Sequence, residues 1–126
     1  MDPKSVHVLL VEDDVFLASI YQKKFEMEGF KVAAVDNGDK VLLEAKKKKP
    51  DIILLDILLP KRDGFSVLAL LKADAELKDI PVIMLTNLGQ KDDVDKALAA
   101  GAVDYLIKAH FKPSEIVDKV RKILHI

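Results

Sequence analysis

Residues 52–60 read IILLDILLP, so one carboxylate, Asp56, stands inside an otherwise apolar run. Four apolar residues precede Asp56 without a polar interruption, which is typical of a strand that is buried on both faces of a sheet. Burying a lone carboxylate is unfavourable unless a cation or hydrogen-bond donors pair with it. The stretch therefore predicts a central strand ending in an acid that either performs chemistry or merely ends the strand.

Four further apolar runs predict strands on either side of this one: Val6–Val11, Val32–Val35, Val82–Leu85 and Tyr105–Ile107. Segments whose apolar residues have helical spacing lie between these strands and after the last one. The expected stripes are Phe16, Leu17, Ile20, Lys24 and Met27; Val41, Leu42 and Ala45; Phe65, Leu68, Leu71 and Lys72; Val94 and Leu98; and Ile116, Val117, Val120, Ile123 and Leu124. Gly29 and Gly101 are expected to end the first and fourth helices.

Strand and helix alternate five times, which predicts an α/β fold with a five-stranded parallel sheet and helices on both faces. Right-handed crossovers make this a doubly wound (βα)5 sandwich, whose functional crevice lies at the carboxyl ends of the strands. The chain has 126 residues, and residues 1–126 are expected to form one domain with a single core.

Composition excludes several classes of function. The chain has 20 Lys plus Arg and 21 Asp plus Glu, so bulk charge does not favour nucleic acid or an acidic membrane as partner. It has no cysteine, which excludes disulfides and thiolate metal sites. The first apolar run is too short for a signal peptide, and nowhere do about 20 apolar residues run together, so we expect a cytoplasmic protein without membrane contact. The lysines at positions 46–49 are expected to complement the dipole at a helix end.

Acidic side chains follow two strands that are neighbours in a doubly wound sheet, the first and the third. The first strand is followed by Glu12, Asp13 and Asp14, and the third by Asp56. Carboxylates that lie close together repel one another unless a cation sits among them, and oxygen-only ligands suit Mg²⁺. We expect Asp14 to cap the following helix instead.

Two further polar residues end strands at the same edge of the sheet. Thr86 ends the fourth strand and Lys108 follows the fifth. Each alone could be a turn or surface residue. Together they would present a hydroxyl and an ammonium to the acids, an arrangement suited to holding a metal or a phosphoryl group.

Four motifs together resemble the receiver domain of response regulators in two-component signal transduction, of the stand-alone single-domain type. They are LLVEDD (9–14), LLDILLPKRDG (54–64), VIMLTN (82–87) and GAVDYLIK (101–108), and the resemblance covers essentially the whole chain. It implies a flavodoxin-like fold with strand order 2-1-3-4-5. It also implies that Asp56 is the phosphoacceptor, forming an aspartyl phosphate in a magnesium-dependent reaction.

The resemblance also implies roles for the surrounding residues. Asp13 would bind Mg²⁺ directly and Glu12 through water, with Asp56 and the backbone carbonyl of Leu58 as further ligands; Mn²⁺ could substitute. Thr86 and Lys108 would bind phosphoryl oxygens. Thr86 and Tyr105 would form the switch, with the Tyr105 rotamer following phosphorylation.

The function implied is a phosphorylation-activated signalling switch. A sensor histidine kinase or phosphotransfer protein would supply the phosphoryl group, and autodephosphorylation would reset the switch. The face formed by the fourth helix, fifth strand and fifth helix would bind a downstream protein or a dimer partner. The domain would catalyse its own modification and would not be an enzyme in the usual sense. The alternative is a pseudo-receiver, a phosphorylation-independent interaction module.

The chain departs from the family pattern after Lys108, where Ala109 replaces the usual proline in IKAHFKPSE (107–115). A cis bond before Ala109 would cost about 2.5–4 kcal/mol, so we expect either a trans bond with a rearranged loop or a strained cis bond. Lys112 is a poor N-cap for a helix beginning at Pro113. Leu58 and Leu88 are expected to hinder attacking water and to slow dephosphorylation.

Overall fold

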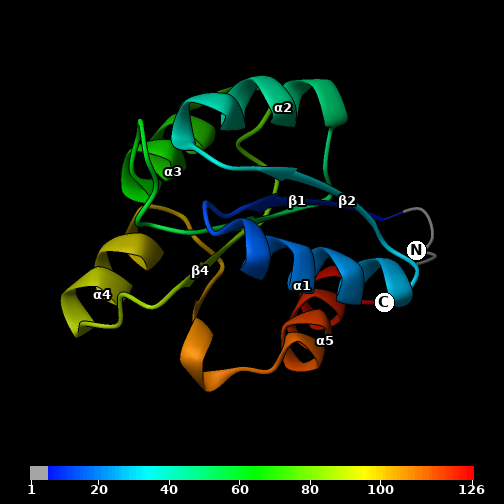
Figure 1. The fold of residues 1–126 in the computed structure, drawn as a ribbon. Helices are drawn as coiled ribbons and strands as arrows, with labels where there is room; N and C mark the ends of the chain where they lie inside the picture. Colours follow the sequence, from blue (N-terminus) through cyan, green and yellow to red (C-terminus); the bar gives the residue numbers. More distant parts are fainter. Residues whose placement is uncertain (1–5) are drawn as a thin grey trace.

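The computed structural model describes residues 6–126 as one parallel sheet with helices on both faces (Figure 1). The strands are β1 (His7–Val11), β2 (Lys31–Val35), β3 (Ile52–Leu55), β4 (Val82–Thr86) and β5 (Asp104–Ile107). Their order is β2-β1-β3-β4-β5, which confirms the expected topology. The observed bounds differ from the expected ones by at most one residue at each end. Residues 1–5 of the expected domain lie outside the described part of the chain.

Five α-helices connect and follow the strands: α1 (Val15–Met27), α2 (Val41–Lys48), α3 (Gly64–Ala73), α4 (Lys91–Ala99) and α5 (Pro113–Leu124). Two 3-10 turns, η2 (Gly38–Lys40) and η3 (Lys108–His110), lie in the connections. Figure 1 shows α1 and α5 together on one face of the sheet and α2 and α3 on the other. None of these helices is long and apolar enough to cross a membrane.

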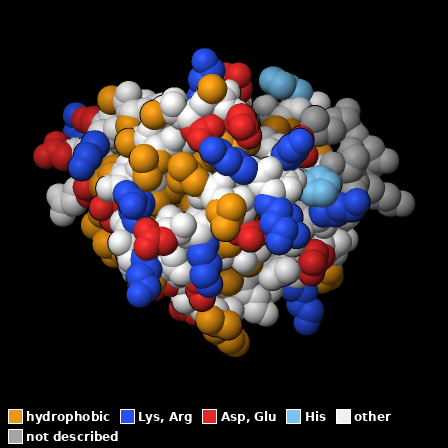
Figure 2. Space-filling model, turned by 90° about the horizontal axis from the view of Figure 1, so that it is seen from above, with side chains coloured by type: hydrophobic (Ala, Val, Ile, Leu, Met, Phe, Trp, Pro, Cys, Tyr) orange, Lys and Arg blue, Asp and Glu red, His pale blue; other side chains and the backbone are white. Residues whose placement is uncertain are grey.

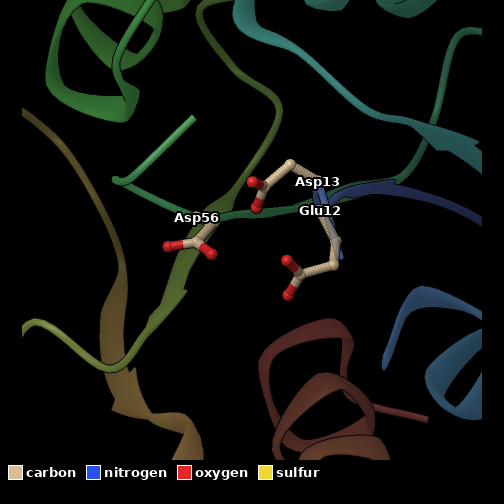
Figure 3. Close-up of side chains that lie close together, drawn as sticks. All are labelled: Glu12, Asp13 and Asp56. Carbon is tan, nitrogen blue, oxygen red and sulfur yellow. The ribbon is translucent and has the colours of Figure 1, made fainter. Parts of the chain in front are cut away.

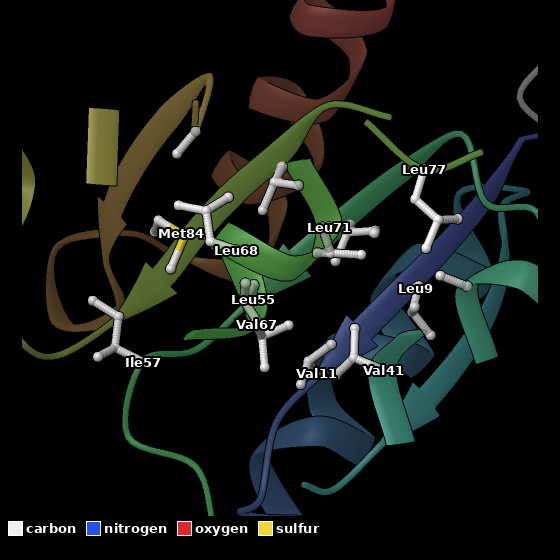
Figure 4. Close-up of a cluster of buried hydrophobic side chains, with 14 of the residues drawn as sticks. Leu9, Val11, Val41, Leu55, Ile57, Val67, Leu68, Leu71, Leu77 and Met84 are labelled. Carbon is white, nitrogen blue, oxygen red and sulfur yellow. The ribbon is translucent and has the colours of Figure 1, made fainter. Parts of the chain in front are cut away.

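Each face of the sheet packs into its own apolar cluster, because successive side chains of a strand point to opposite faces. On β1, Leu9 and Val11 pack with α2 and α3, as Figure 4 shows, whereas Val8 and Leu10 pack with α1 and α5. All four residues of β3 are fully buried. The unbroken apolar run before Asp56 is therefore a central strand, as its sequence predicts.

The sheet-facing side of α1 differs from the expected stripe. Phe16 and Met27 are 77% and 73% exposed, whereas Ala18, Tyr21 and Phe25 are the buried residues of the helix. Small Ala18 allows close approach to the sheet, and Phe25 packs edge-on against Phe30 with ring centroids 5.4 Å apart. Of the expected stripe, Leu17 packs against the apolar cluster of this face, whereas Phe16 and Met27 do not. Apolar character alone could not decide between them.

Helix ends follow the sequence signals more closely. Gly29 and Gly101 adopt positive φ of 96° and 110° just after α1 and α4, which confirms both expected stops. The Asp14 carboxylate accepts the N–H of Leu17 at 3.0 Å and caps α1 as expected. Lys112 offers no side-chain cap to α5, but its own N–H donates to the Glu115 carboxylate at 2.8 Å.

Two close backbone approaches fix the loop between β3 and α3. A Cβ on Gly38 would lie 1.9 Å from the Arg62 carbonyl oxygen, and one on Gly64 would lie 2.2 Å from the Asp56 carbonyl oxygen. The Gly38 N–H also donates to the Pro60 carbonyl at 3.1 Å. Only glycine allows these contacts, so both residues hold the segment that follows Asp56 against the rest of the domain.

The charged side chains over α2 and α3 are of both signs. Figure 2 views this side of the molecule and shows Lys and Arg interspersed with Asp and Glu. Lys46, at the end of α2, pairs with Asp74 at 2.9 Å, and Arg62 pairs with Asp39 at 3.3 Å. The lysines of α2 lie in its last turn and are exposed, which agrees with the predicted solvated helix end.

Candidate functional site

Asp56 lies at the open end of β3 and is only 5% exposed. Its Oδ1 accepts the backbone N–H of Ile57 at 2.6 Å and that of Leu58 at 3.3 Å. These bonds hold the carboxylate against the loop that follows the strand, and Oδ2 is left for other partners. The acid in the apolar run is thus oriented by its own loop.

The acids after β1 lie beside Asp56 because β1 and β3 are paired, with Val11 opposite Leu55. Figure 3 shows Glu12 and Asp13 projecting toward Asp56 from the end of β1. Each of the three residues offers a carboxylate oxygen within 4.8 Å of the others. Glu12 and Asp56 are buried, while Asp13 is exposed. The sheet therefore gathers the acidic cluster that the strand ends predict.

Lys108 supplies the countercharge for the two buried acids. Its Nζ donates to Asp56 Oδ2 at 2.5 Å and also bonds Glu12 Oε1, and its side chain is 9% exposed. Burial lowers the pKa of Lys108, but its bonds to both carboxylates outweigh burial and leave this pKa above the ordinary 10.5. Burial raises the pKa of Glu12, and Lys108 offsets part of that rise.

Thr86 and Tyr105 meet through one residue of the loop after β4. Thr86 is fully buried, and its hydroxyl oxygen accepts the N–H of Leu88 at 3.3 Å. The Tyr105 hydroxyl donates to the backbone carbonyl of the same Leu88. Burial raises the pKa of Tyr105 to about 12. The two residues of the expected switch thus share Leu88 as a hydrogen-bonding neighbour.

These residues line a cavity of about 330 Å³ at the carboxyl ends of the strands. Its lining consists of Glu12, Asp13, Asp14, Leu17, Asp56, Leu58, Thr86, Asn87 and Lys108. Leu58 lines it as expected and is 62% exposed, whereas Leu88 packs against the apolar core instead. Tyr105 is not part of this lining and contacts the loop after β4 through its bond to Leu88.

Asn87 was not expected at the site from the sequence. It lines the cavity directly after Thr86, and its Oδ1 accepts the N–H of Ala109 at 3.1 Å. Its position immediately after a predicted strand end was the signal that could have identified it.

Residues 6–126 contain no cis peptide bond, so the Lys108–Ala109 bond is trans and the loop continues as the turn η3. This is the first of the two alternatives for the altered loop.

Comparison with known proteins agrees with this geometry. The family model described as "Response regulator receiver domain" matches residues 8–121. The chain belongs to this family. As a receiver domain of two-component response regulators, it has the fold and the strand-end polar residues that its motifs predict.

Individual relatives include transcriptional regulators and other receiver domains. It is 39% identical over 93% of its length to the DNA-binding dual master transcriptional regulator RpaA of Synechocystis sp., covering 48% of that protein. A response regulator structure from Chloroflexus aurantiacus matches with a TM-score of 0.88 and 31% identity, covering 96% of this chain and 98% of that one. The BeF3-activated N-terminal receiver domain of Klebsiella pneumoniae RstA matches with a TM-score of 0.85 and 27% identity, covering 91% and 95%. The chain spans about half the length of the curated relatives it matches.

The acidic cluster of this receiver domain could hold a metal ion. Its side-chain donors are the carboxylates of Glu12, Asp13 and Asp56, and hard oxygen ligands suit Mg²⁺. Exposed Asp13 leaves one side of the cluster open to water, which Mg²⁺ retains in most protein sites. The donor set therefore fits a magnesium ion in its chemistry.

Proposed function

We propose that this domain is a phosphorylation-activated switch whose Asp56 accepts a phosphoryl group from a phospho-histidine on a sensor kinase or phosphotransfer protein. The observation that carries the proposal is the placement of Asp56. It is a nearly buried carboxylate, held by two backbone N–H groups and one ammonium, at an open cavity that other acids line. Membership of the receiver family supports the same role.

In this proposal one Asp56 oxygen forms a bond to phosphorus while the bond from phosphorus to the donor histidine nitrogen breaks. The departing imidazole regains neutrality by taking up a proton. Lys108 already contacts Asp56, so its ammonium can follow the carboxylate to a phosphoryl oxygen. The Thr86 hydroxyl would donate to a second phosphoryl oxygen once it releases Leu88. These residues supply orientation and countercharge, which is most of what phosphoryl transfer asks of a protein.

Glu12, Asp13, Asp56 and the backbone carbonyl of Leu58 would hold Mg²⁺ or Mn²⁺ in this site. When bound, the ion would add positive charge against the phosphoryl oxygens. Lys108 bridges Glu12 and Asp56 in this structure, and it would shift from Glu12 as the ion enters.

Thr86 and Tyr105 would carry the signal outward. If the Thr86 hydroxyl turns to a phosphoryl oxygen, the N–H of Leu88 loses its acceptor. The same residue holds the Tyr105 hydroxyl, so a shift of Leu88 would release the ring. Such a two-state element would change the α4-β5-α5 face, where a downstream protein or a second copy would bind.

Water admitted to the same cavity would hydrolyse the aspartyl phosphate and reset the switch. The domain would then catalyse its own phosphorylation and dephosphorylation and would not turn over a separate substrate. We propose no nucleic-acid contact for residues 6–126, because their surface charges are mixed in sign and the net charge of the whole chain is −1.

The second candidate is a pseudo-receiver that binds partners without phosphorylation. The observation that favours it is the Lys108 bridge, which satisfies both buried acids without a ligand. Incubation with Mg²⁺ and acetyl phosphate, followed by intact-mass measurement, separates the two functions. The switch requires one added phosphoryl group in the wild type and none in Asp56→Asn. An unmodified wild type would establish the pseudo-receiver.

A further inference from the structure

The backbone hydrogen bonds between β4 and β5 are followed, at the site, by a bond from the backbone to a side chain. The Val103 N–H donates to the Val82 carbonyl, and the pairing continues to Thr86 opposite Ile107. A parallel ladder repeats such a bond every two residues along the donor strand. The next donor beyond Ile107 is therefore the Ala109 N–H, and its ladder acceptor would be the Leu88 carbonyl.

The structure has a different pairing at this point. The Leu88 carbonyl accepts the Tyr105 hydroxyl, while the Ala109 N–H donates to Asn87 Oδ1 at 3.1 Å. Only the oxygen of the Asn87 amide can accept from an N–H, so this side chain takes over the role of the Leu88 carbonyl. The Asn87 side chain thus accepts the next bond of the ladder, and the Leu88 carbonyl accepts the Tyr105 hydroxyl.

This exchange of acceptors depends on the residue after Lys108. Ala109 keeps an N–H that proline would lack, and its trans bond leads into the turn η3, closed by Phe111 N–H to the Lys108 carbonyl at 3.3 Å. That closing bond is internal to the loop. Among the hydrogen bonds of residues 6–126, the Asn87 bond is the one that ties the backbone of Lys108–His110 to a neighbouring element.

We propose that Asn87 is a positioning residue for Lys108. Its side-chain oxygen holds the N–H of Ala109, and this bond fixes the turn from which the Lys108 ammonium reaches Asp56 and Glu12. The inference that Asn87 positions Lys108 rests on the structure alone. The inference that Asn87 affects phosphorylation also rests on the proposed function. Asn87 acts through Lys108 and makes no contact of its own with the reacting atoms.

The test compares Asn87→Ala with Asn87→Asp, which keeps an oxygen acceptor, and with Gln90→Ala. Gln90 is an exposed amide on the same loop whose side chain does not cap α4. Two NMR measurements on metal-free, unphosphorylated protein report the positioning directly. They are hydrogen exchange of the Ala109 amide and the resonance of the Lys108 ammonium.

We expect Ala109 exchange to become about tenfold faster in Asn87→Ala, with a shifted or broadened Lys108 signal, because the tethering bond is lost. Asn87→Asp should keep the Ala109 protection, and Gln90→Ala should match the wild type in both measurements. The rate of phosphorylation by acetyl phosphate should fall about three- to tenfold in Asn87→Ala, as expected for one lost hydrogen bond.

Unchanged Ala109 exchange or an unchanged Lys108 signal in Asn87→Ala would overturn the inference. A slower phosphorylation rate with both signals unchanged would instead assign Asn87 a direct contact with the phosphoryl group. Failure of the wild type to take up phosphate would overturn the proposed function only, since both NMR measurements judge the positioning role without phosphorylation.

Discussion

Replacing Lys108 with methionine should destabilise the domain in a manner that depends on pH. Lys108 joins Glu12 and Asp56, which are 3% and 5% exposed, so Lys108→Met leaves two buried carboxylates without countercharge. Removing one member of a buried ion pair costs about 3–5 kcal/mol when the remaining charge has no escape. Here Glu12 can escape by taking up a proton, because burial already raises its pKa.

Protonation of Glu12 limits the part of the stability loss that Glu12 causes, while Asp56 keeps its two backbone N–H donors. Its ordinary pKa is 4.5, and each unit between that value and the working pH costs about 1.4 kcal/mol. The limit is therefore about 3.4 kcal/mol at pH 7.0 and about 1.4 kcal/mol at pH 5.5. Because a raised carboxyl pKa favours the folded state most at low pH, the loss should shrink as the pH falls. Lys108 stays charged over this range in the wild type, since its pKa lies above 10.5.

Urea unfolding followed by far-UV circular dichroism measures the loss, with EDTA present so that metal does not replace the ammonium. Lys23→Met is the matched control, because Lys23 is an exposed lysine on α1 and its loss should change stability by less than about 0.5 kcal/mol. We expect Lys108→Met to lose about 3 kcal/mol at pH 7.0 and about 1 kcal/mol at pH 5.5. An equal loss at the two pH values would refute the reasoning, as would a loss no larger than that of the control.

Three further predictions concern residues in and near the site. Gly38→Ala should lower the free energy of unfolding by more than about 2 kcal/mol, because the new Cβ would meet the Arg62 carbonyl. In thermal melts Gly89→Ala should cost less, because its Cβ would meet only the tip of the Ile107 side chain. Tyr105 should ionise near pH 12 and not near 10, seen as the difference in ultraviolet absorbance between wild type and Tyr105→Phe. Loss of phosphate from Asp56 should be faster in Leu58→Asn, since an amide can orient water where Leu58 excludes it; an equal or longer phosphorylated half-life in the variant would count against this.

Strand prediction from this sequence succeeded because the strands are short apolar runs that end in polar residues. Parallel topology then brings the carboxyl ends of β1 and β3 together, so Glu12, Asp13 and Asp56 could be grouped before any geometry was known. The structure also places Lys108 against Asp56. These residues share one property: each follows a strand of the parallel sheet, so strand order brings their backbones to the same edge.

Prediction failed where side-chain packing chooses between similar options. On α1 the most apolar stripe contains Phe16 and Met27, yet the smaller Ala18 and the aromatic Tyr21 and Phe25 face the sheet. The role of Asn87 was missed for a related reason. Its partner is a backbone N–H that is available only because the Lys108–Ala109 bond is trans and leads into η3, and the sequence left that geometry open.

The charge balance of the site explains why one constellation could serve both states of a switch. Glu12, Asp13 and Asp56 contribute three negative charges when ionised, and Lys108 contributes one positive charge, so the cluster carries a net charge of about −2. A divalent cation would neutralise that charge, which is why the metal-free cluster depends so heavily on Lys108. Phosphorylation of Asp56 would convert one negative charge into about two at neutral pH. The added charge exceeds what the bridging Lys108 can balance alone, and the Thr86 O–H would be available to donate to it, because in this structure the Thr86 oxygen accepts the N–H of Leu88. The excess of negative charge that holds Lys108 between two acids before phosphorylation would therefore also draw the Thr86 hydroxyl toward the phosphoryl group.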